Sequence, residues 1–318
     1  MNEARRDLRT LIAAELGRSV PAGALALASA VRERHGSAVK AVLFYGSCLR
    51  KGEDREGVLD LYALVDGYRG AYESAPLAAI NAVLPPNVFY IETRHAGRKV
   101  RAKYAVLSLS DLAHATSTST FEPYFWARFA QPCALAWSAG PDVTSEVATA
   151  LTDAVLTFVG AGLALAPEDF DARELWEAML SETYRCEVRA ERAGAGADLV
   201  RFAPERYAEV TRLALAALGI EAAPRGEGVD THWTVPLPDR RRALARLQWT
   251  LRRGVGKSLF LLRILRNALI FEGGIDYVIW KVERHSGTRV DPSWRESRFR
   301  LFALGAEVLR QYRRGAFR

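Results

Sequence analysis

The first third of the chain carries both helical and strand-like patterns of apolar residues. Apolar positions recur at helical spacing over 8–31, with an interruption near Pro21. Runs typical of buried strands lie at 38–45 and 58–65, and two further strands are predicted at 87–93 and 99–107. Another helix is predicted over 72–83, and Pro85 ends it. This order predicts a mixed β-sheet with flanking helices.

Strand patterns fade after about residue 141, where long helical patterns take over. These patterns cover 143–165, 171–193, 204–218, 239–272 and 296–314. The predicted fold class is therefore α+β, a mixed β-sheet with flanking helices followed by an all-helical domain. We expect an α/β domain at 1–140, a helical domain at 141–290 and a basic amphipathic C-terminal helix at 291–318.

Composition narrows the class of protein. The 318 residues, 49% of them hydrophobic, are enough for two domains with a substantial core. The three cysteines have no paired spacing, and the N-terminus is charged rather than apolar. We therefore expect a reducing, intracellular location without a signal peptide. The most apolar stretch, 154–167, is shorter than the roughly 20 residues that span a bilayer, so a buried helix is predicted there.

The formal net charge of +7 favours an anionic partner. Nucleotide phosphates, nucleic acid and anionic lipid headgroups all satisfy that requirement, and charge does not choose among them. No sequence motif of a nucleic-acid-binding module is found, so we expect no nucleic-acid partner.

The strongest chemical signal is a glycine and a serine at the end of one strand, followed by an aspartate in the next. Gly46 and Ser47 follow the run at 38–45, and Asp60 lies twelve intervening residues later, beyond a charged stretch at 50–57 that is predicted to be an exposed loop. Backbone amides at such a turn can hold phosphates, and a carboxylate on the adjacent strand can hold Mg²⁺. Nucleotidyl transfer needs both. The alternative is a simple strand, turn and helix with an incidental aspartate.

The strand, Gly46-Ser47 and Asp60 resemble the DNA polymerase beta-type nucleotidyltransferase superfamily, which implies a nucleotidyltransferase-type sheet. That superfamily usually has a second acid two positions after the first, on the same face of the strand. This chain has Tyr62 there. Glu92, in the third strand, is the candidate for the second metal ligand, with Asp66 as the alternative. Without a second ligand the protein would be inactive.

A more specific resemblance runs along about 40–285, to the mitochondrial-type CTP:phosphatidate cytidylyltransferases. In that family an aspartate in an apolar strand likewise lacks an acid two positions later. The segments that are similar to the family, in the same order, are 59–66, 103–112, 124–132, 175–185, 262–274 and 275–281. Phe129 and Gln131 depart from the family pattern.

This resemblance implies Mg²⁺-dependent transfer of CMP from CTP to phosphatidic acid, giving CDP-diacylglycerol and pyrophosphate. Asp60 would bind Mg²⁺, and the phosphate of the lipid would be the nucleophile, so catalysis would be mainly positioning and electrostatics. The residues expected to contact the nucleotide are Gly46, Ser47, Tyr62, Lys103 and Arg128, and Lys103 is also a catalytic candidate because it could neutralise the triphosphate.

Each remaining candidate has a structural alternative. Lys103 could be a solvated strand residue, and Arg128 could stack on the aromatic residues around it. Tyr184 and Arg185 lie on a helix whose like charges share faces, which indicates either a polar cleft or an ordinary charged surface. The residues expected to bind the lipid phosphate are Tyr184, Arg185, Lys281 and Arg284. The last two could instead cap the C-terminus of a helix.

The C-terminal part of the chain has two further features, a pair of glycines and a basic segment. The sequence around Gly254 and Gly256 resembles a P-loop, but Leu251 stands where that motif needs a glycine, and no buried strand precedes it. We expect these two glycines to break a helix. The segment 294–318 holds seven arginines against two glutamates and could dock on a membrane surface, or pack on the protein with a solvated face.

Three functions therefore stand. The first is phosphatidate cytidylyltransferase, located in the cytoplasm and peripherally on the inner face of the membrane. The second is a nucleotidyltransferase acting on another acceptor, such as a small molecule, a protein or RNA. The third is a catalytically inactive nucleotide- or lipid-binding protein, which the tyrosine at Tyr62 suggests.

Overall fold

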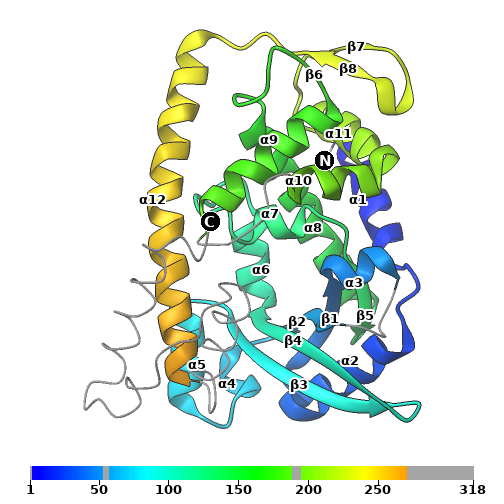
Figure 1. Cartoon of the computed structure of the whole chain (residues 1–318), viewed down its shortest axis with the longest axis vertical. Helices are drawn as coiled ribbons and strands as arrows, with labels where there is room; N and C mark the ends of the chain where they lie inside the picture. Colours follow the sequence, from blue (N-terminus) through cyan, green and yellow to red (C-terminus); the bar gives the residue numbers. More distant parts are fainter. Residues whose placement is uncertain (1, 53–56, 188–194, 271–318) are drawn as a thin grey trace, which may run out of the picture.

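A five-stranded mixed sheet lies at one end of the molecule, and helices cover it (Figure 1). The computed structural model describes residues 2–52, 57–187 and 195–270, and the predicted α+β fold class is confirmed. The strand order is β3-β4-β2-β1-β5, in which only the β2–β4 pairing is parallel. The strands are β1 (Val39–Tyr45), β2 (Leu59–Val65), β3 (Asn87–His95), β4 (Arg98–Ser108) and β5 (Ala134–Ser138).

The central strands β1 and β2 are buried on both faces, which explains their apolar runs, whereas alternate residues of β3 are exposed. On β2, Tyr62 and Leu64 face the larger hydrophobic cluster, which extends through the helical part of the chain. Leu61 and Ala63 face a smaller cluster that includes apolar residues of α2 (Ala22–His35). Because successive side chains of a strand alternate between faces, Asp60 shares the face of Tyr62, toward the helical part.

Most predicted helices are present, although the one predicted over 171–193 ends at Arg185, the helices at Trp126–Phe129 and Ala195–Phe202 were not predicted, and 296–314 lies outside the described residues. The helices around the sheet are α1 (Glu3–Leu16), α2, α3 (Gly46–Lys51), α4 (Tyr68–Ala71), α5 (Ala75–Val83), α6 (Leu109–Thr116) and α7 (Trp126–Phe129). The helical part contains α8 (Pro141–Gly162), α9 (Ala172–Arg185), α10 (Ala195–Phe202), α11 (Pro204–Ala217) and α12 (Asp239–Ile270). The predicted domain boundary at 140/141 coincides with the start of α8. The division into domains stays a prediction, because the larger hydrophobic cluster crosses that boundary.

Three short strands interrupt the part that we predicted to be all-helical. They are β6 (Asp169–Asp171), β7 (Ala223–Arg225) and β8 (His232–Thr234), which form a second sheet in the order β6-β8-β7. Each has three residues, too few to show a two-residue alternation, and β7 contains Pro224. Strand β5 of the main sheet was also absent from the prediction, and helix α3, which begins at the Gly46 turn, includes Arg50 and Lys51 of the predicted loop.

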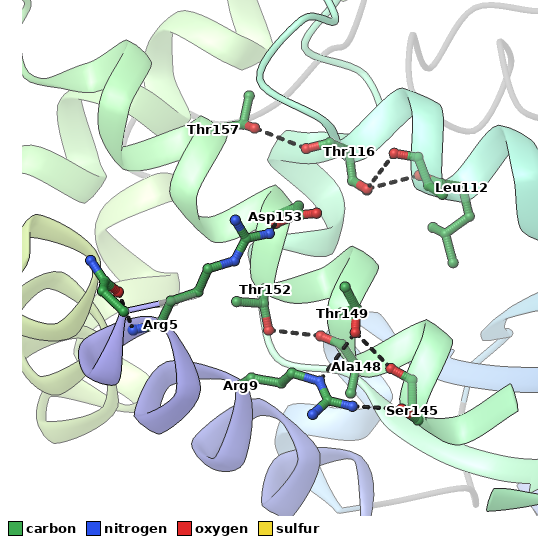
Figure 2. Close-up of polar contacts among 12 residues, drawn as sticks. Arg5, Arg9, Leu112, Thr116, Ser145, Ala148, Thr149, Thr152, Asp153 and Thr157 are labelled. Atoms are coloured by element: carbon green, nitrogen blue, oxygen red, sulfur yellow. Dashed lines mark hydrogen bonds and ion pairs between the residues drawn. The ribbon is translucent and has the colours of Figure 1, made fainter. Parts of the chain in front are cut away.

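Helix α1 is fastened to α8 by polar side chains (Figure 2). Arg5 pairs with Asp153, and Arg9 donates to Thr149 Oγ1 over 3.1 Å. On another side of α8, Thr157 Oγ1 donates to the Thr116 carbonyl of α6 over 2.9 Å. Polar contacts of this kind fix the direction of a helix more sharply than apolar packing alone, so α8 joins the N-terminal helix to the sheet end of the molecule.

Helix α12 runs without a break through Gly254 and Gly256, so the predicted interruption there is wrong (Figure 1). A Cβ atom at Gly256 would lie 2.7 Å from the Cys186 carbonyl oxygen and 2.9 Å from its Cβ. The glycine therefore permits a close approach between α12 and the end of α9. Gly254 meets nothing within 4 Å and is simply exposed.

One helix in the described part of the chain is long and apolar enough to cross a membrane. This is α8, whose most apolar window has a mean hydropathy of 1.2 and is 61% buried inside the protein. Trp126 and Trp176 belong to the same hydrophobic cluster as the buried residues of α8. The burial agrees with the buried helix expected over 154–167.

Candidate functional site

The centre of the candidate site is the junction between β1, α3 and β2. Strand β1 ends at Tyr45, Gly46 has a φ of 85°, and the six-residue helix α3 begins there. No side chain caps the first turn of α3, and Ser47 is exposed. A left-handed φ favours glycine, which has no Cβ to collide with its own backbone. The predicted strand–glycine–serine turn is therefore present.

Gly46 lies directly against the carboxylate of Asp60. Asp60 is the β2 partner of Tyr45, and a Cβ atom built on Gly46 would lie 2.5 Å from Asp60 Oδ2. The residue at 46 must therefore lack a side chain for two separate reasons, its φ and its neighbour. The sequence placed these two residues on adjacent strands, and the register brings them into contact.

Lys103 approaches the same carboxylate from the other side of β2. The two residues are partners in the parallel β2–β4 pairing, and Lys103 Nζ lies 3.0 Å from Asp60 Oδ1. The Lys103 side chain is 45% exposed and that of Asp60 is 17% exposed. Asp60 Oδ1 is buried and makes no hydrogen bond of good geometry, because the ammonium is close but poorly aligned. The site is a half-buried carboxylate beside a cation that reaches solvent.

Replacing Gly46 with alanine is expected to displace the Asp60 carboxylate. The new Cβ would meet Oδ2 well inside van der Waals contact, and alanine at a left-handed φ is strained. We expect a loss of about 1–3 kcal/mol in the free energy of unfolding, measured by urea denaturation. We also expect a loss of whatever activity depends on Asp60.

Gly52 provides the matched control for this change. Its φ is 65°, and a Cβ there would meet nothing within 4 Å. Gly52→Ala therefore carries the backbone strain without the collision. Equal losses of stability in the two variants, together with unchanged activity in Gly46→Ala, would contradict the contact between Gly46 and Asp60.

Tyr62 and Arg128 form a buried pair behind Asp60. Tyr62 is fully buried, and its hydroxyl accepts a hydrogen bond from Arg128 Nη1 over 3.0 Å. Its ring packs against Tyr45 and Phe129, with centroids 5.1 and 4.9 Å away. Burial raises the pKa of the Tyr62 hydroxyl. Tyr62 thus positions Arg128 from inside the core, and it has no exposed surface with which to contact a nucleotide as predicted.

Three residues that the sequence analysis did not assign to the site surround Arg128. Its guanidinium lies 4.3 Å from the ring centroid of Tyr124, and Nη2 lies 3.7 Å from a carboxylate oxygen of Glu187. Arg263 of α12 also lies 4.3 Å from the Tyr124 ring centroid. Spacing could have suggested the pair Tyr124 and Arg128, four residues apart. No local signal connects them to Arg263.

The charges of this cluster are balanced. Arg263 pairs with Glu122 through two hydrogen bonds, and Arg128 pairs with Glu187. Burial and Glu187 would raise the pKa of the Tyr124 hydroxyl, but Arg128 and Arg263 lower it, and the net shift is downward. The cluster therefore resembles a structural network as much as a binding site, which matches the stacking alternative stated for Arg128.

Glu92 does not share a site with Asp60, contrary to our candidate assignment. It pairs with Arg101 across the β3–β4 ladder, one strand beyond Lys103, and Lys99 Nζ lies 2.6 Å from its carboxylate. Its side chain is 42% exposed. The hydrogen bond from Lys99 outweighs the small effect of burial and lowers the pKa of Glu92. Asp66, the alternative, lies at the far end of β2, where it pairs with Lys40.

The predicted lipid-binding residues are only partly described. Tyr184 is half-buried and packs against the larger hydrophobic cluster. Arg185 is exposed and pairs with Glu182 at the surface. Lys281, Arg284 and the predicted helix at 291–318 lie outside the described residues. The structure thus gathers Gly46, Asp60 and Lys103 in one place, with Arg128 in the core beside them.

A metal ion at this site would depend on Asp60. Within 2–52, 57–187 and 195–270, no group of three histidine, cysteine, aspartate or glutamate side chains is close enough to hold an ion. Asp60 remains, with one oxygen that lacks a hydrogen bond. Mg²⁺ is often held by one or two carboxylates together with substrate phosphates and water. The residues present therefore fit an ion shared with a triphosphate.

Comparison of the sequence with protein-family models and with curated proteins found no match. The geometry of the site and the resemblance carried by the sequence motifs are therefore what indicate a function.

Proposed function

We propose that this protein is a nucleotidyltransferase that transfers CMP from CTP to phosphatidic acid and releases pyrophosphate. The observation that carries the proposal is the contact of Gly46 with the Asp60 carboxylate, with Lys103 3.0 Å from the same group. A side-chain-free turn, a carboxylate and a partly exposed cation are the three elements that transfer of a nucleotide from a triphosphate requires.

In the proposed reaction an oxygen of the lipid phosphate attacks the α-phosphorus of CTP. The bond from that phosphorus to the oxygen bridging to the β-phosphate breaks, and pyrophosphate leaves with the electron pair. Lys103 offsets charge on the leaving group, and the bare backbone at Gly46 lets phosphate oxygens approach its N–H and that of Ser47. No covalent intermediate on the protein is needed.

Asp60 is the residue that would hold Mg²⁺, together with phosphate oxygens of the nucleotide. When bound, Mg²⁺ supplies charge neutralisation at the α- and β-phosphates. Lys103 now balances the Asp60 carboxylate, and with the nucleotide present its half-exposed side chain can turn toward the triphosphate. Arg128 supports the site from the core by holding Tyr62 and the end of β1 in place.

The choice of phosphatidic acid as the acceptor of CMP is supported by the resemblance to the phosphatidate cytidylyltransferases and by the basic net charge. Peripheral attachment to the inner face of the membrane, and a cytoplasmic location otherwise, follow from a lipid substrate and belong to the same proposal. Lys281 and Arg284, with Tyr184, remain the proposed contacts of the lipid phosphate.

The proposal is tested by measuring pyrophosphate release by the full-length protein from each of the four nucleoside triphosphates, with Mg²⁺ and detergent micelles. We expect release with CTP only when phosphatidic acid is present, and we expect chelation of Mg²⁺ to abolish it. Release without the lipid, or with another nucleotide in preference, would contradict the acceptor or the nucleotide. Mass spectrometry of the lipid product distinguishes transfer from hydrolysis of CTP.

A second candidate, a nucleotide-binding protein without turnover, is favoured by one observation. The Asp60 carboxylate already has Lys103 as its partner, and no second carboxylate joins it among the residues that the structure describes. Binding of CTP, measured by calorimetry, together with no release of pyrophosphate under any of these conditions would favour this function over the transferase.

A further inference from the structure

The outward face of α12 is apolar along most of its length. Helix α12 stands along one side of the molecule and runs from the small β6–β8 sheet to the region of α4 and α5 (Figure 1). Seven aliphatic side chains of this helix are between 43% and 60% exposed: Leu244, Leu247, Leu251, Val255, Leu261, Leu262 and Leu265. Spacings of three, four and seven residues place six of them in one stripe, with Leu261 at its edge. Apolar side chains exposed in a row in this way mark a candidate interaction site.

The opposite face of the same helix is packed against the protein. Trp249 is fully buried and stacks edge-on against Trp126, and Arg263 is 6% exposed. Gly256 allows the close contact with Cys186. The helix thus uses its inward face to join the body of the protein. The leucine stripe is a second apolar face that the described residues leave uncovered.

Cations flank the stripe. Over Asp239–Ile270 there are nine arginines and lysines against the single acid Asp239. Five of the cations bind carboxylates or carbonyl oxygens of the body: Arg242, Arg252, Arg253, Arg263 and Arg266. The other four, Arg240, Arg241, Arg246 and Lys257, are exposed, and none pairs with a carboxylate in the part of the chain that the structure describes.

We propose that the outward face of α12 docks on an anionic phospholipid bilayer. Leucine side chains can enter the boundary between headgroups and acyl chains, while arginine and lysine beside them reach up to the phosphates. Each cation near an anionic surface adds a further attraction. The inference concerns a surface apart from Asp60 and does not rest on the proposed reaction, since binding to vesicles needs no nucleotide.

Charge argues against two other partners that could cover the leucine stripe, which are residues 271–318 of the same chain and a second copy of α12. Residues 271–318 hold ten arginines and lysines against six aspartates and glutamates, so this segment of the chain is itself basic. In a dimer formed through this face, the four exposed cations of one α12 would lie close to the same cations of the other. Like charges along a helix pair oppose association, whereas an anionic lipid surface attracts all of them.

The test is sedimentation of the full-length protein with vesicles of phosphatidylcholine, with and without phosphatidylserine. We expect binding that requires phosphatidylserine and falls with added salt. Leu247→Gln and Leu251→Gln should each weaken it about tenfold, because each removes a leucine from the lipid. Leu25→Gln is the matched control, because Leu25 lies on α2 and is 42% exposed, and its binding should be unchanged. Equal melting temperatures would exclude misfolding as the cause.

A label at position 251 identifies the occupant directly. The three native cysteines are buried, so Leu251→Cys can be labelled selectively with a polarity-sensitive fluorophore. A polar environment in solution that becomes apolar with phosphatidylserine vesicles supports the proposal. An apolar environment without vesicles would overturn it. Light scattering would then show what covers the stripe, which would be a second copy of the protein if it is a dimer and residues 271–318 if it is a monomer.

Discussion

Asp60→Asn is expected to lower CTP-dependent pyrophosphate release on the order of 10³-fold, because it removes the one carboxylate that the described residues offer to Mg²⁺ at this site. The substitution keeps the size of the side chain and its contact with Gly46. It leaves Lys103 without its acidic partner, but the Lys103 side chain is 45% exposed and is solvated by water. We therefore expect the melting temperature to change little, so that the loss measures chemistry rather than folding.

Two other acidic residues supply controls of the same charge change. Asp66→Asn alters the far end of β2, where the carboxylate pairs with Lys40, and Glu92→Gln alters the exposed group that pairs with Lys99. Both variants should retain the activity of the wild type within a factor of about two, since surface ion pairs of this kind contribute little. A loss in Glu92→Gln as large as that in Asp60→Asn would contradict the geometry and restore Glu92 as a metal ligand.

The sequence predicts the part of the site that is set by the order of neighbouring elements along the chain. Gly46 ends one apolar strand, and Asp60 lies in the next. Because consecutive strands usually pair, the contact between them could be expected. The buried strands β1 and β2 carry clear apolar runs, and four of the five strands of the main sheet were located from the sequence. The fifth, β5, is only five residues long and follows a short helix.

Strand register and contacts between residues far apart in the sequence explain why the other site predictions were wrong or missing. Nothing in the sequence around Glu92 states that it pairs with Arg101 rather than with the strand that carries Asp60. A shift of a few residues in the β3–β4 register would have placed Glu92 opposite a different residue of β4. Arg263 reaches Tyr124 from more than a hundred residues away, and Gly256 is explained only by the Cys186 backbone that it faces. Tertiary packing decides each of these positions.

Arg206→Met is expected to reduce the free energy of unfolding by about 3–5 kcal/mol, because it removes both hydrogen bonds to the buried Glu15 carboxylate and leaves, among the described residues, only Arg18, 3.6 Å away. Both side chains are 6% exposed, and Arg206 donates to the two carboxylate oxygens of Glu15 over 2.8 and 3.1 Å. Burial alone would lower the pKa of Arg206, but Glu15 raises it above the ordinary value. The measurement is urea denaturation followed by circular dichroism.

The exposed pair of Arg212 and Glu209 on the same helix, α11, is the control. It has the same bidentate geometry at 2.7 and 2.8 Å, but its side chains are 55% and 43% exposed. Arg212→Met should therefore cost less than about 1 kcal/mol. The double variant Glu15→Met with Arg206→Met should recover most of the loss, since it removes both buried charges. A loss in the double variant as large as in Arg206→Met would assign the effect to packing.

The same pair connects the N-terminal helix to the candidate site. Glu15 belongs to α1, Arg206 to α11, and Arg206 also donates to the Ala130 carbonyl over 3.0 Å, directly after the helix that carries Arg128. Loss of Arg206 therefore frees the end of that helix as well as α1. We expect Arg206→Met to lower CTP turnover even at temperatures where the protein is folded, whereas Arg212→Met should not. Unchanged turnover in folded Arg206→Met would mean that Arg128 is held by Tyr62 and Glu187 alone.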